Sequence, residues 1–385
     1  MSELITSTRK KVVAFYLPQF HSIPENDKWW GEGFTEWTNT RKATPLFAGH
    51  YQPKIPKDEN YYDLSDARVL EEQSIIAQNY GVYGFCYYHY WFKNGKKLLE
   101  KPVEQMLHNP RVNIPFMLCW ANENWTRNWD GGCFEVIARQ EYGTRKDWQS
   151  HIDYLLPFFK DDRYITFQGK PILIIYKPEQ IILFDEMVAL WRKTIMKAGF
   201  PGLIVLRQYP GTIMRQLDGA VKFQPMYSLN TGNDGSYHKQ SLQKEIKSIV
   251  KKSIILAGKE QYLQQKMVDV LTANKKSVKP LRIYDYDECW QAILNDQFFN
   301  DRLCNGAFTA WDNTARNKRG VIFLGSTPEK FERYMTELFR KSSAMDLVFI
   351  NAWNEWGEGA YLEADEKYGY AYLEALKNAI DHAGS

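Results

Sequence analysis

Near its C-terminus the chain reads Leu347-Val348-Phe349-Ile350-Asn351-Ala352-Trp353-Asn354-Glu355-Trp356-Gly357-Glu358-Gly359. The first four residues form a continuous apolar run, which is typical of a parallel strand covered on both faces. Glu355 and Glu358 follow in a glycine-rich turn close to two tryptophans, and a carboxyl group beside indole rings tends to have a raised pKa. Two carboxyls in different surroundings suit chemistry at a glycosidic bond. The alternative is that both are surface glutamates.

Seven similar apolar runs precede this one, at 12–17, 82–88, 115–120, 171–176, 203–208, 220–224 and 307–311. Helical patterns lie between several of them, at 65–80, 178–198 and 328–341, the first with Asp63 or Ser65 as its N-cap. Eight strands alternating with helices predict an α/β fold, a (β/α)8 TIM barrel that forms a single catalytic domain over residues 1–385. A doubly wound open sheet is the alternative, but no Gly-x-Gly-x-x-Gly motif follows a strand.

Polar and aromatic residues gather where seven of the eight predicted strands end, and a TIM barrel carries its active site at these ends. The loop 19–57 is long and rich in Trp, Gly and Pro, and such loops are usually functional. Amides, carboxylates and aromatic faces suit the hydroxyls and C–H faces of sugars. The candidate substrate-binding residues are Tyr16, Gln19, His21, Trp29, Trp30, Tyr88, His89, Trp120, Asn122, Glu123, Trp125, Arg207, Gln224, Trp311, Asp312, Trp353 and Asn354. In the structural alternative, the aromatics fill the core and the polar groups bond their own loops.

Residues 228–300, between the sixth and seventh strands, are expected to form a basic helical insertion. Its segment 239–282 holds 11 basic and 3 acidic residues, and Ile246, Ile249 and Ile254 contribute to a narrow apolar stripe. A basic amphipathic helix can lie on an anionic membrane surface, which predicts peripheral contact at the inner membrane face. The more frequent alternative is a helix that packs on the domain with its lysines in solvent.

The composition excludes several other functions. A net charge of +3 does not predict nucleic-acid binding. Five cysteines without a Cys-x-x-Cys motif indicate neither a disulfide framework nor a thiolate zinc site, and Cys86 and Cys119 are expected in the core. No metal-binding histidine spacing, Walker loop or Gly-x-Ser-x-Gly elbow occurs, so no metal or cofactor is expected. No signal peptide or membrane-spanning run is visible, which predicts a cytoplasmic protein.

Four motifs resemble the WbsX-like proteins, which are related to the endo-α-1,2-mannosidases and mannanases of glycoside hydrolase family 99. They are, in order, Phe-Tyr-Leu-Pro-Gln-Phe-His at 15–21, Gly-Phe-Thr-Glu-Trp at 33–37, Trp-Ala-Asn-Glu-Asn-Trp at 120–125, and Trp-Asn-Glu-Trp-Gly-Glu-Gly at 353–359. The resemblance covers about residues 10–375 and implies a (β/α)8 barrel with its site at the C-terminal face of the strands.

The resemblance also implies roles for the two glutamates. By analogy, Glu355 removes the proton from the sugar's own 2-hydroxyl, which attacks the anomeric carbon. Glu358 protonates the leaving oxygen and then activates water. The chain departs from the hydrolases at Gly357, where they carry histidine, and this departure bears on substrate identity. WbsX-like proteins are associated with bacterial O-antigen and capsule loci and are often described as glycosyltransferases.

These observations predict a carbohydrate-active enzyme that resembles retaining endo-α-mannosidases. It would cleave or transfer at an α-glycosidic bond of an oligo- or polysaccharide in O-antigen, lipopolysaccharide or capsule metabolism. One alternative is a glycosyltransferase with a nucleotide- or lipid-linked donor, which the basic segment favours and the lack of a Rossmann-type donor site disfavours. A non-catalytic glycan-binding barrel and an unrelated barrel hydrolase are the others. The retained glutamates argue against the former, and the four ordered motifs argue against the latter.

Overall fold

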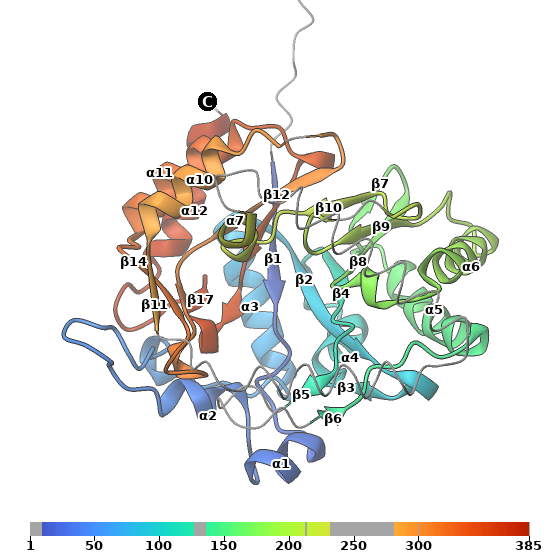
Figure 1. Ribbon diagram of the computed structural model, residues 1–385, viewed down its shortest axis with the longest axis horizontal. Helices are drawn as coiled ribbons and strands as arrows, with labels where there is room; N and C mark the ends of the chain where they lie inside the picture. Colours follow the sequence, from blue (N-terminus) through green and yellow to red (C-terminus); the bar gives the residue numbers. More distant parts are fainter. Residues whose placement is uncertain (1–9, 127–135, 212–213, 232–280, 299, 385) are drawn as a thin grey trace, which may run out of the picture.

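The computed structural model describes residues 10–126, 136–211, 214–231, 281–298 and 300–384. Eight parallel strands form a closed barrel, which confirms the predicted fold (Figure 1). The barrel strands are β1 (Lys11–Tyr16), β2 (Val82–Trp91), β4 (Phe116–Trp120), β8 (Lys170–Ile175), β9 (Ile204–Arg207), β10 (Gly219–Val221), β12 (Leu303–Phe308) and β15 (Leu347–Asn351). Each pairs with the next along the chain, and β15 pairs with β1 to close the barrel. The expectation of a single domain over residues 1–385 stays a prediction.

Helices pack around the barrel, with α10 to α12 on one side of Figure 1 and α5 and α6 on the other. The larger helices are α3 (Ala67–Asn79), α4 (Lys101–His108), α5 (Arg145–Phe159), α6 (Phe184–Lys197), α10 (Tyr286–Asn295), α11 (Pro328–Phe339) and α12 (Ala371–Gly384). The predicted N-cap of α3 is wrong. Asp66 caps it by accepting a 3.0 Å hydrogen bond from the Arg68 N–H, whereas the Asp63 carboxylate accepts from the Ser65 N–H in the preceding turn.

Short elements make up the rest of the described chain. The helical ones are α1 (Pro24–Trp30), α2 (Glu36–Arg41), α7 (Met226–Thr231) and the 3-10 turns η1 (Lys57–Glu59), η2 (Lys93–Gly95), η4 (Pro178–Gln180), η6 (Asn313–Ala315), η7 (Ala344–Asp346) and η8 (Trp356–Glu358). The short strands are β3 (Lys97–Leu98), β5 (Trp125–Thr126), β6 (Val136–Ala138), β7 (Thr166–Phe167), β11 (Arg282–Asp285), β13 (Trp311–Asp312), β14 (Val321–Leu324), β16 (Asn354–Glu355) and β17 (Ala360–Tyr361). The carboxyl ends of β1 and β2 point to the side on which α1 and α2 lie (Figure 1).

The seventh barrel strand begins earlier than its apolar pattern predicts. β12 starts at Leu303 rather than at residue 307, because its first half contains Asn305 and Gly306, which conceal the strand in the sequence. A Cβ at position 306 would lie 1.9 Å from the carbonyl oxygen of Lys222. The glycine therefore permits close approach to the end of β10.

The alternation of side chains along β2 decides which of them enter the barrel. Tyr88 stacks on Phe15 of β1 at 5.6 Å, and the Phe15 ring also contacts Phe349 of the neighbouring strand β15 and Phe223, which follows β10. His89, the next residue along β2, instead meets helix α5 outside the barrel. Because side chains alternate in direction along a strand, a shift of one residue decides whether a side chain enters the barrel or faces the surrounding helices.

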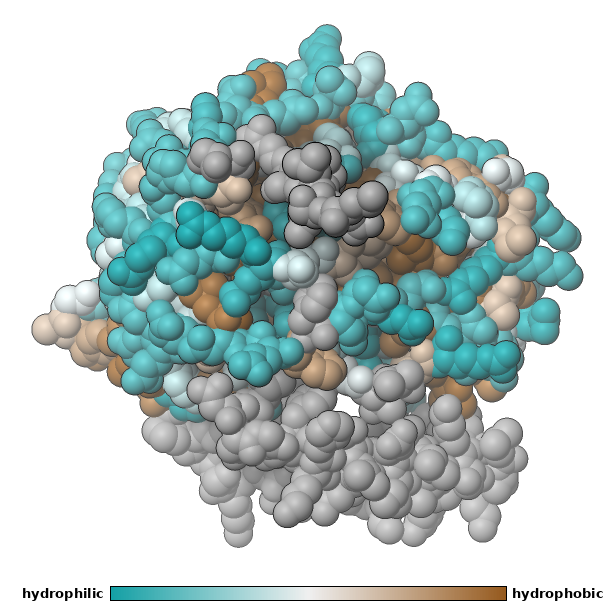
Figure 2. All heavy atoms as spheres, turned by 90° about the horizontal axis from the view of Figure 1, so that it is seen from above, coloured by the Kyte–Doolittle hydropathy of each residue, from teal (hydrophilic) through white to brown (hydrophobic). Residues whose placement is uncertain are grey.

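The predicted basic insertion falls largely on residues 232–280, which lie outside the described residues, as does most of the segment 239–282. Within the described chain, α7 precedes this stretch and β11 and α10 follow it. Among the helices that the structure describes, none is both long and apolar enough to cross a membrane. The coloured surface in Figure 2 is mainly hydrophilic, with hydrophobic residues in separate small groups.

Candidate active site

The two glutamates of the C-terminal motif meet at one guanidinium group. Arg316 Nη2 donates to Glu355 Oε1 at 2.7 Å, and Arg316 Nη1 pairs with Glu358 Oε1 at 2.7 Å. Both glutamates belong to the turn that continues β15, the last barrel strand, so they lie at the C-terminal face of the barrel. The structure therefore brings the two predicted catalytic carboxylates together at the expected face.

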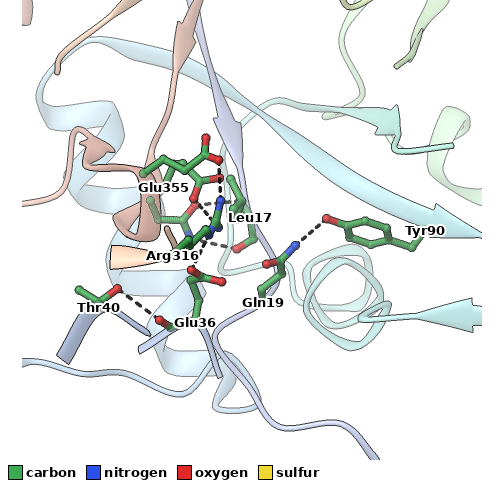
Figure 3. Close-up of polar contacts among 9 residues, drawn as sticks. Leu17, Gln19, Glu36, Thr40, Tyr90, Arg316 and Glu355 are labelled. Carbon is green, nitrogen blue, oxygen red and sulfur yellow. Dashed lines mark hydrogen bonds and ion pairs between the residues drawn. The ribbon is translucent and has the colours of Figure 1, made fainter. Parts of the chain in front are cut away.

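A third carboxylate, which the sequence analysis did not select, joins this pair. Arg316 Nε donates to Glu36 Oε1 at 2.8 Å, and the Glu36 side chain is fully buried at the start of α2 (Figure 3). The available signal was that Glu36 stands in the Gly33–Trp37 motif. For Arg316, the only available signal was its nearness in the sequence to the polar end of the seventh predicted strand. We call Glu36, Arg316, Glu355 and Glu358 the Arg316 cluster.

Two glycines let the turn pack against this cluster. A Cβ at position 357 would lie 2.0 Å from Glu36 Oε1 and 2.7 Å from Arg316 Nε, which is closer than any real contact. Gly359 has φ +61°, and a Cβ there would lie 3.2 Å from backbone atoms of Asp312. At position 357 the Glu36–Arg316 pair thus fills the space that a side chain would occupy.

Burial and the charge of Glu36 raise the pKa of both glutamates of the motif. For Glu355, burial raises the pKa well above its usual range. Arg316 opposes this rise, whereas Glu358 and Glu36 add to it. The pKa of Glu358 is also raised by burial and by Glu36, against Arg316. The Glu358 side chain is 24% exposed and that of Glu355 is 9% exposed, so Glu358 is the more accessible to solvent.

Asp312 holds the loop that carries Arg316. Its Oδ2 accepts from Gln52 Nε2 and is 2.8 Å from His50 Nε2, and its Oδ1 accepts from the backbone N–H and hydroxyl of Thr314. This last contact caps η6, whose final turn leads into Arg316. Asp312 is therefore occupied by loop contacts, and the alternative role of loop capping describes it better than substrate contact does.

Gln19 and Tyr90 lie beside the Arg316 cluster. Gln19 Nε2 donates to the Tyr90 hydroxyl at 2.8 Å (Figure 3). Glu355 and Arg316 both act on the pKa of Tyr90, which burial raises above its usual value. Gln19 Oε1 is buried and has no hydrogen-bond donor among the described residues. Gln19 is thus a predicted site residue that the structure brings to the glutamates.

Aromatic side chains lie next to this position. Trp125 packs edge-on against Tyr90 with ring centroids 4.9 Å apart, and half-buried Trp30 packs against the same small cluster and stacks on Phe34. Trp29 is also half-buried, and its ring lies 6.0 Å from Lys28 Nζ. Tyr88 points into the barrel, where its hydroxyl accepts from Gln208 Nε2. Stacking of these aromatics on sugars stays a prediction.

Three of the selected residues face the outer shell of the barrel rather than the site. Tyr16 is fully buried and donates to Gln73 of α3 at 2.5 Å. His89 is 2.9 Å from His151 of α5, and burial lowers its pKa to about 3. Trp120 bonds the Trp91 carbonyl and lines a small pocket near α5 and α6. The prediction placed them in the mouth because strand-end position alone does not reveal side-chain direction.

Two asparagines clamp backbone segments together and are buried. Asn354 accepts from the Leu17 N–H at 2.8 Å and donates to the Leu17 carbonyl at 3.0 Å. Asn122 makes the same pair of bonds to the backbone of Lys177, both at 2.8 Å. Their amides therefore join neighbouring strand ends, and their contact with a sugar stays a prediction.

Other selected residues are occupied in a similar way. Gln224 Oε1 accepts from the Ser228 N–H, and His21 is buried next to the backbone of Pro18, so that burial lowers its pKa. Trp353 packs on Phe85 at 5.1 Å in the outer core. Trp311 is buried in β13, opposite Phe323 of β14.

The two remaining polar candidates form ion pairs at the strand ends. Glu123 pairs with Lys177, and Arg207 Nη2 pairs with Glu179 Oε2 at 2.8 Å. Burial is the main cause of the raised pKa of Tyr176 and of Tyr209, and the charges of Glu123 and Glu358 raise it further. Glu123 and Glu358 therefore both lie near Tyr176 and Tyr209.

A second buried network supports the turn from behind. Glu363 accepts from Trp356 Nε1 at 2.6 Å, from the Tyr62 hydroxyl at 2.8 Å and from Gln73 Nε2 at 2.7 Å. Burial raises the pKa of Glu363 to about 7, against these hydrogen bonds. Trp356 lies between Glu355 and Glu358 in the sequence, so Glu363 holds the turn that carries them.

Solved structures with a similar fold act on, or are named for, glycosides. One is titled a glycoside hydrolase-like protein, with a TM-score of 0.53 and 11% identity, covering 99% of this chain and 96% of that one. Another is the GH99 endo-alpha-mannosidase from Bacteroides thetaiotaomicron, with a TM-score of 0.51 and 13% identity, covering 96% of both chains. At these identities the likeness shows the shared barrel fold alone.

Curated relatives have higher identity. Two uncharacterized proteins called WxcX, from two strains of Xanthomonas campestris pv. campestris, are 34% identical over 386 residues and 35% identical over 383 residues. Each alignment covers 97% of this chain, and the chain spans about half the length of these relatives. The family model described as Glycosyltransferase WbsX matches residues 12–376, and the chain therefore belongs to the WbsX family.

Proposed function

We propose that the chain is a glycan-processing enzyme that cleaves or transfers at an α-glycosidic bond, in the manner of retaining endo-α-mannosidases. The observation that carries this proposal is the pairing of Glu355 and Glu358 with Arg316 at the C-terminal face of the barrel. Burial raises the pKa of both carboxyls, and a coupled pair that shares a proton can supply one acid and one base.

The different exposure of the two glutamates suggests their roles. Glu358 is the more accessible, which suits a group that protonates the leaving oxygen and later takes a proton from water. Glu355 is then the base that takes the proton of the sugar's 2-hydroxyl as that oxygen attacks the anomeric carbon, which is the role that the resemblance implies for it. The C–O bond to the leaving group breaks as the new C–O bond forms. Water then opens the resulting ring, and an acceptor sugar in its place gives transfer.

The nature of the barrel mouth favours this chemistry over a nucleotide-linked donor. Lys177 and Arg207 at the ends of β8 and β9, and Arg316 after η6, are each paired with glutamates of the chain. A phosphate-bearing donor needs cations or N–H groups that are not already committed. The second candidate, a glycosyltransferase with a nucleotide- or lipid-linked donor, is favoured by the description of the family and by the greater length of the relatives.

The biological setting is part of the proposal. The activity would serve bacterial cell-surface polysaccharide metabolism, such as that of O-antigen or capsule, in the cytoplasm. The basic segment 239–282 would provide peripheral contact with the inner membrane face, and it lies mostly outside the described residues. This contact is separable from the chemistry at the barrel mouth.

Product analysis by mass spectrometry tests the proposal. The protein would be incubated with α-mannosides and with extracted lipid-linked oligosaccharides, with and without a panel of sugar nucleotides. Glu358→Gln is the test variant, and Glu332→Gln on the distant helix α11 is the matched control. Cleaved or rearranged glycan without nucleotide, lost only in Glu358→Gln, supports the proposal. Chain growth that requires a sugar nucleotide supports the second candidate. Glycan binding without turnover identifies a binding barrel.

A further inference from the structure

The Arg316 cluster is assembled from three segments that are far apart in the sequence. Glu36 comes from α2, Arg316 from the turn after η6, and Glu355 and Glu358 from the turn after β15. Figure 3 shows Glu36, Arg316 and Glu355 converging. We propose that Arg316 is the positioning residue of the Glu355–Glu358 pair, and that Glu36, acting through Arg316, sets how many protons this pair holds. The acid and base roles of Glu355 and Glu358 rest on the proposed function, but the sharing of protons between their carboxyl groups does not.

The geometry of the guanidinium supports the positioning role. A guanidinium carries five N–H donors in a rigid plane, and here three of its nitrogens each bond a different glutamate at 2.7 to 2.8 Å. A planar group with three fixed partners determines the direction of each carboxylate. One lysine ammonium could supply the charge but not this fixed fork. Arg316 itself is 12% exposed, so solvent competes little for its donors.

The charges in the cluster do not balance. Three carboxylates face one guanidinium, so a fully ionised cluster carries a net charge of −2 in a buried site. Burying unbalanced charge is costly, and coupled carboxyls relieve it by retaining a proton. Burial opposes the charge of Arg316, but the three glutamates outweigh it and hold its pKa well above the ordinary value. The retained proton therefore belongs to the carboxyl groups.

Glu36 is the member best suited to control this proton without taking part in the reaction. It is fully buried, and Gly357 leaves room for its carboxylate against the turn. Its Oε2 has no hydrogen-bond donor among the described residues. Its charge is therefore compensated mainly through Arg316, and it acts on both glutamates of the pair.

The other titratable groups near the cluster include three tyrosines and the Glu123–Lys177 ion pair, which acts on two of them. Tyr90 of β2 interacts with Glu355, and Tyr176 and Tyr209, which follow β8 and β9, interact with Glu358. Burial raises the pKa of each of them, so they stay neutral near pH 7. The protonation of the pair near neutrality then depends on Arg316 and Glu36.

The test compares pH profiles of variants that change the charge in opposite directions. Arg316→Gln removes a positive charge, so the alkaline limb of the activity profile is expected to move up by about one pH unit or more. Glu36→Gln removes a negative charge, so the same limb is expected to move down by a similar amount. Arg316→Lys keeps the positive charge, so the alkaline limb is expected to stay near its wild-type pH. Because the lysine lacks the fixed fork, kcat is expected to fall at least tenfold. Arg192→Lys, which alters the ion pair with Asp218, is the control.

A second readout works without any substrate. The pH dependence of the thermal midpoint, measured for the same variants, reports proton uptake by the folded cluster. Opposite displacements in Arg316→Gln and Glu36→Gln support the proposal, even where the wild-type protein turns over no glycan and the proposed function fails. Displacements in one direction, or none, overturn it. So does an Arg316→Lys variant with wild-type kcat, since a fixed fork is then unnecessary. If Arg316→Gln does not fold, the proposal is decided by the displacement of the pH dependence in Glu36→Gln and by the kcat of Arg316→Lys.

Discussion

Gly357 and Glu36 are packed so closely that a Cβ at position 357 would lie 2.0 Å from Glu36 Oε1. The two residues are distant in the sequence, and their contact joins the first long loop of the chain to its last barrel strand. Because Arg316 Nε bonds the same Glu36 oxygen, the contact also determines where the guanidinium lies. The glycine is thus a condition for the Arg316 cluster.

Gly357→Ala tests this packing. The added methyl group must displace Glu36 or Arg316, so the free energy of unfolding is expected to fall by about 1–3 kcal/mol, as for overpacked cores. Urea unfolding of the purified protein measures the change. The double variant Gly357→Ala/Glu36→Ala is the matched comparison. If the alanine clashes with Glu36, it costs less in the Glu36→Ala background, whereas equal costs in both backgrounds would place the clash elsewhere.

Amide replacement tests the acid–base assignment. Glu358→Gln and Glu355→Gln keep the side-chain size but cannot transfer the proton, so each is expected to lower kcat about 100- to 10,000-fold. Initial rates on the glycan found by product analysis provide the measurement, with Glu332→Gln as control. Near wild-type kcat in either variant would remove that glutamate from the mechanism.

The half-buried Glu363 predicts a pH dependence of stability. Its pKa is about 7 in the folded protein against an ordinary value of 4.5, so the folded state binds the proton more tightly. The stabilisation from this proton is fully present below pH 4.5 and is lost as the pH rises through about 7. The whole change is on the order of 3 kcal/mol.

Denaturant unfolding between pH 4.5 and 8 measures this effect in the wild type and in Glu363→Gln. Glu355 and Glu358 contribute in the same direction, so the difference between the two proteins isolates Glu363. We expect a smaller fall of stability with pH in the variant. Parallel curves for the two proteins would show that Glu363 does not titrate in this range.

Asn354 predicts a structural phenotype at a position that resembles a ligand contact. Asn354→Ala removes both bonds to the Leu17 backbone and leaves two buried groups unpaired, so a loss of about 2–4 kcal/mol is expected. The variant is expected to lower kcat through misplacement of Glu355, with KM changed little. Asn122→Ala, which breaks the equivalent clamp on Lys177, serves as comparison. A large rise in KM confined to Asn354→Ala would instead indicate substrate contact.

Local sequence was sufficient for the strands of the barrel and for the turn that carries Glu355 and Glu358. Buried parallel strands are continuous apolar runs, and the pattern of such runs is visible without any knowledge of their partners. The exception was the first half of β12, where Asn305 and Gly306 interrupt the run. The helix α3 was found with its cap misplaced by one residue from Ser65 to Asp66, because several capping residue types stand side by side there.

Tertiary structure alone decided which strand-end residues enter the site. Tyr16 and His89 stand at strand ends as Gln19 and Tyr88 do, yet the first two face helices outside the barrel and the others face its mouth. Side chains alternate along a strand, so direction depends on a register that only the closed sheet determines. The partners of Glu355 were equally hidden, because Glu36 and Arg316 lie in loops. Ion pairs between segments remote in the sequence leave no periodic pattern, and only the folding of the barrel brings such charges together.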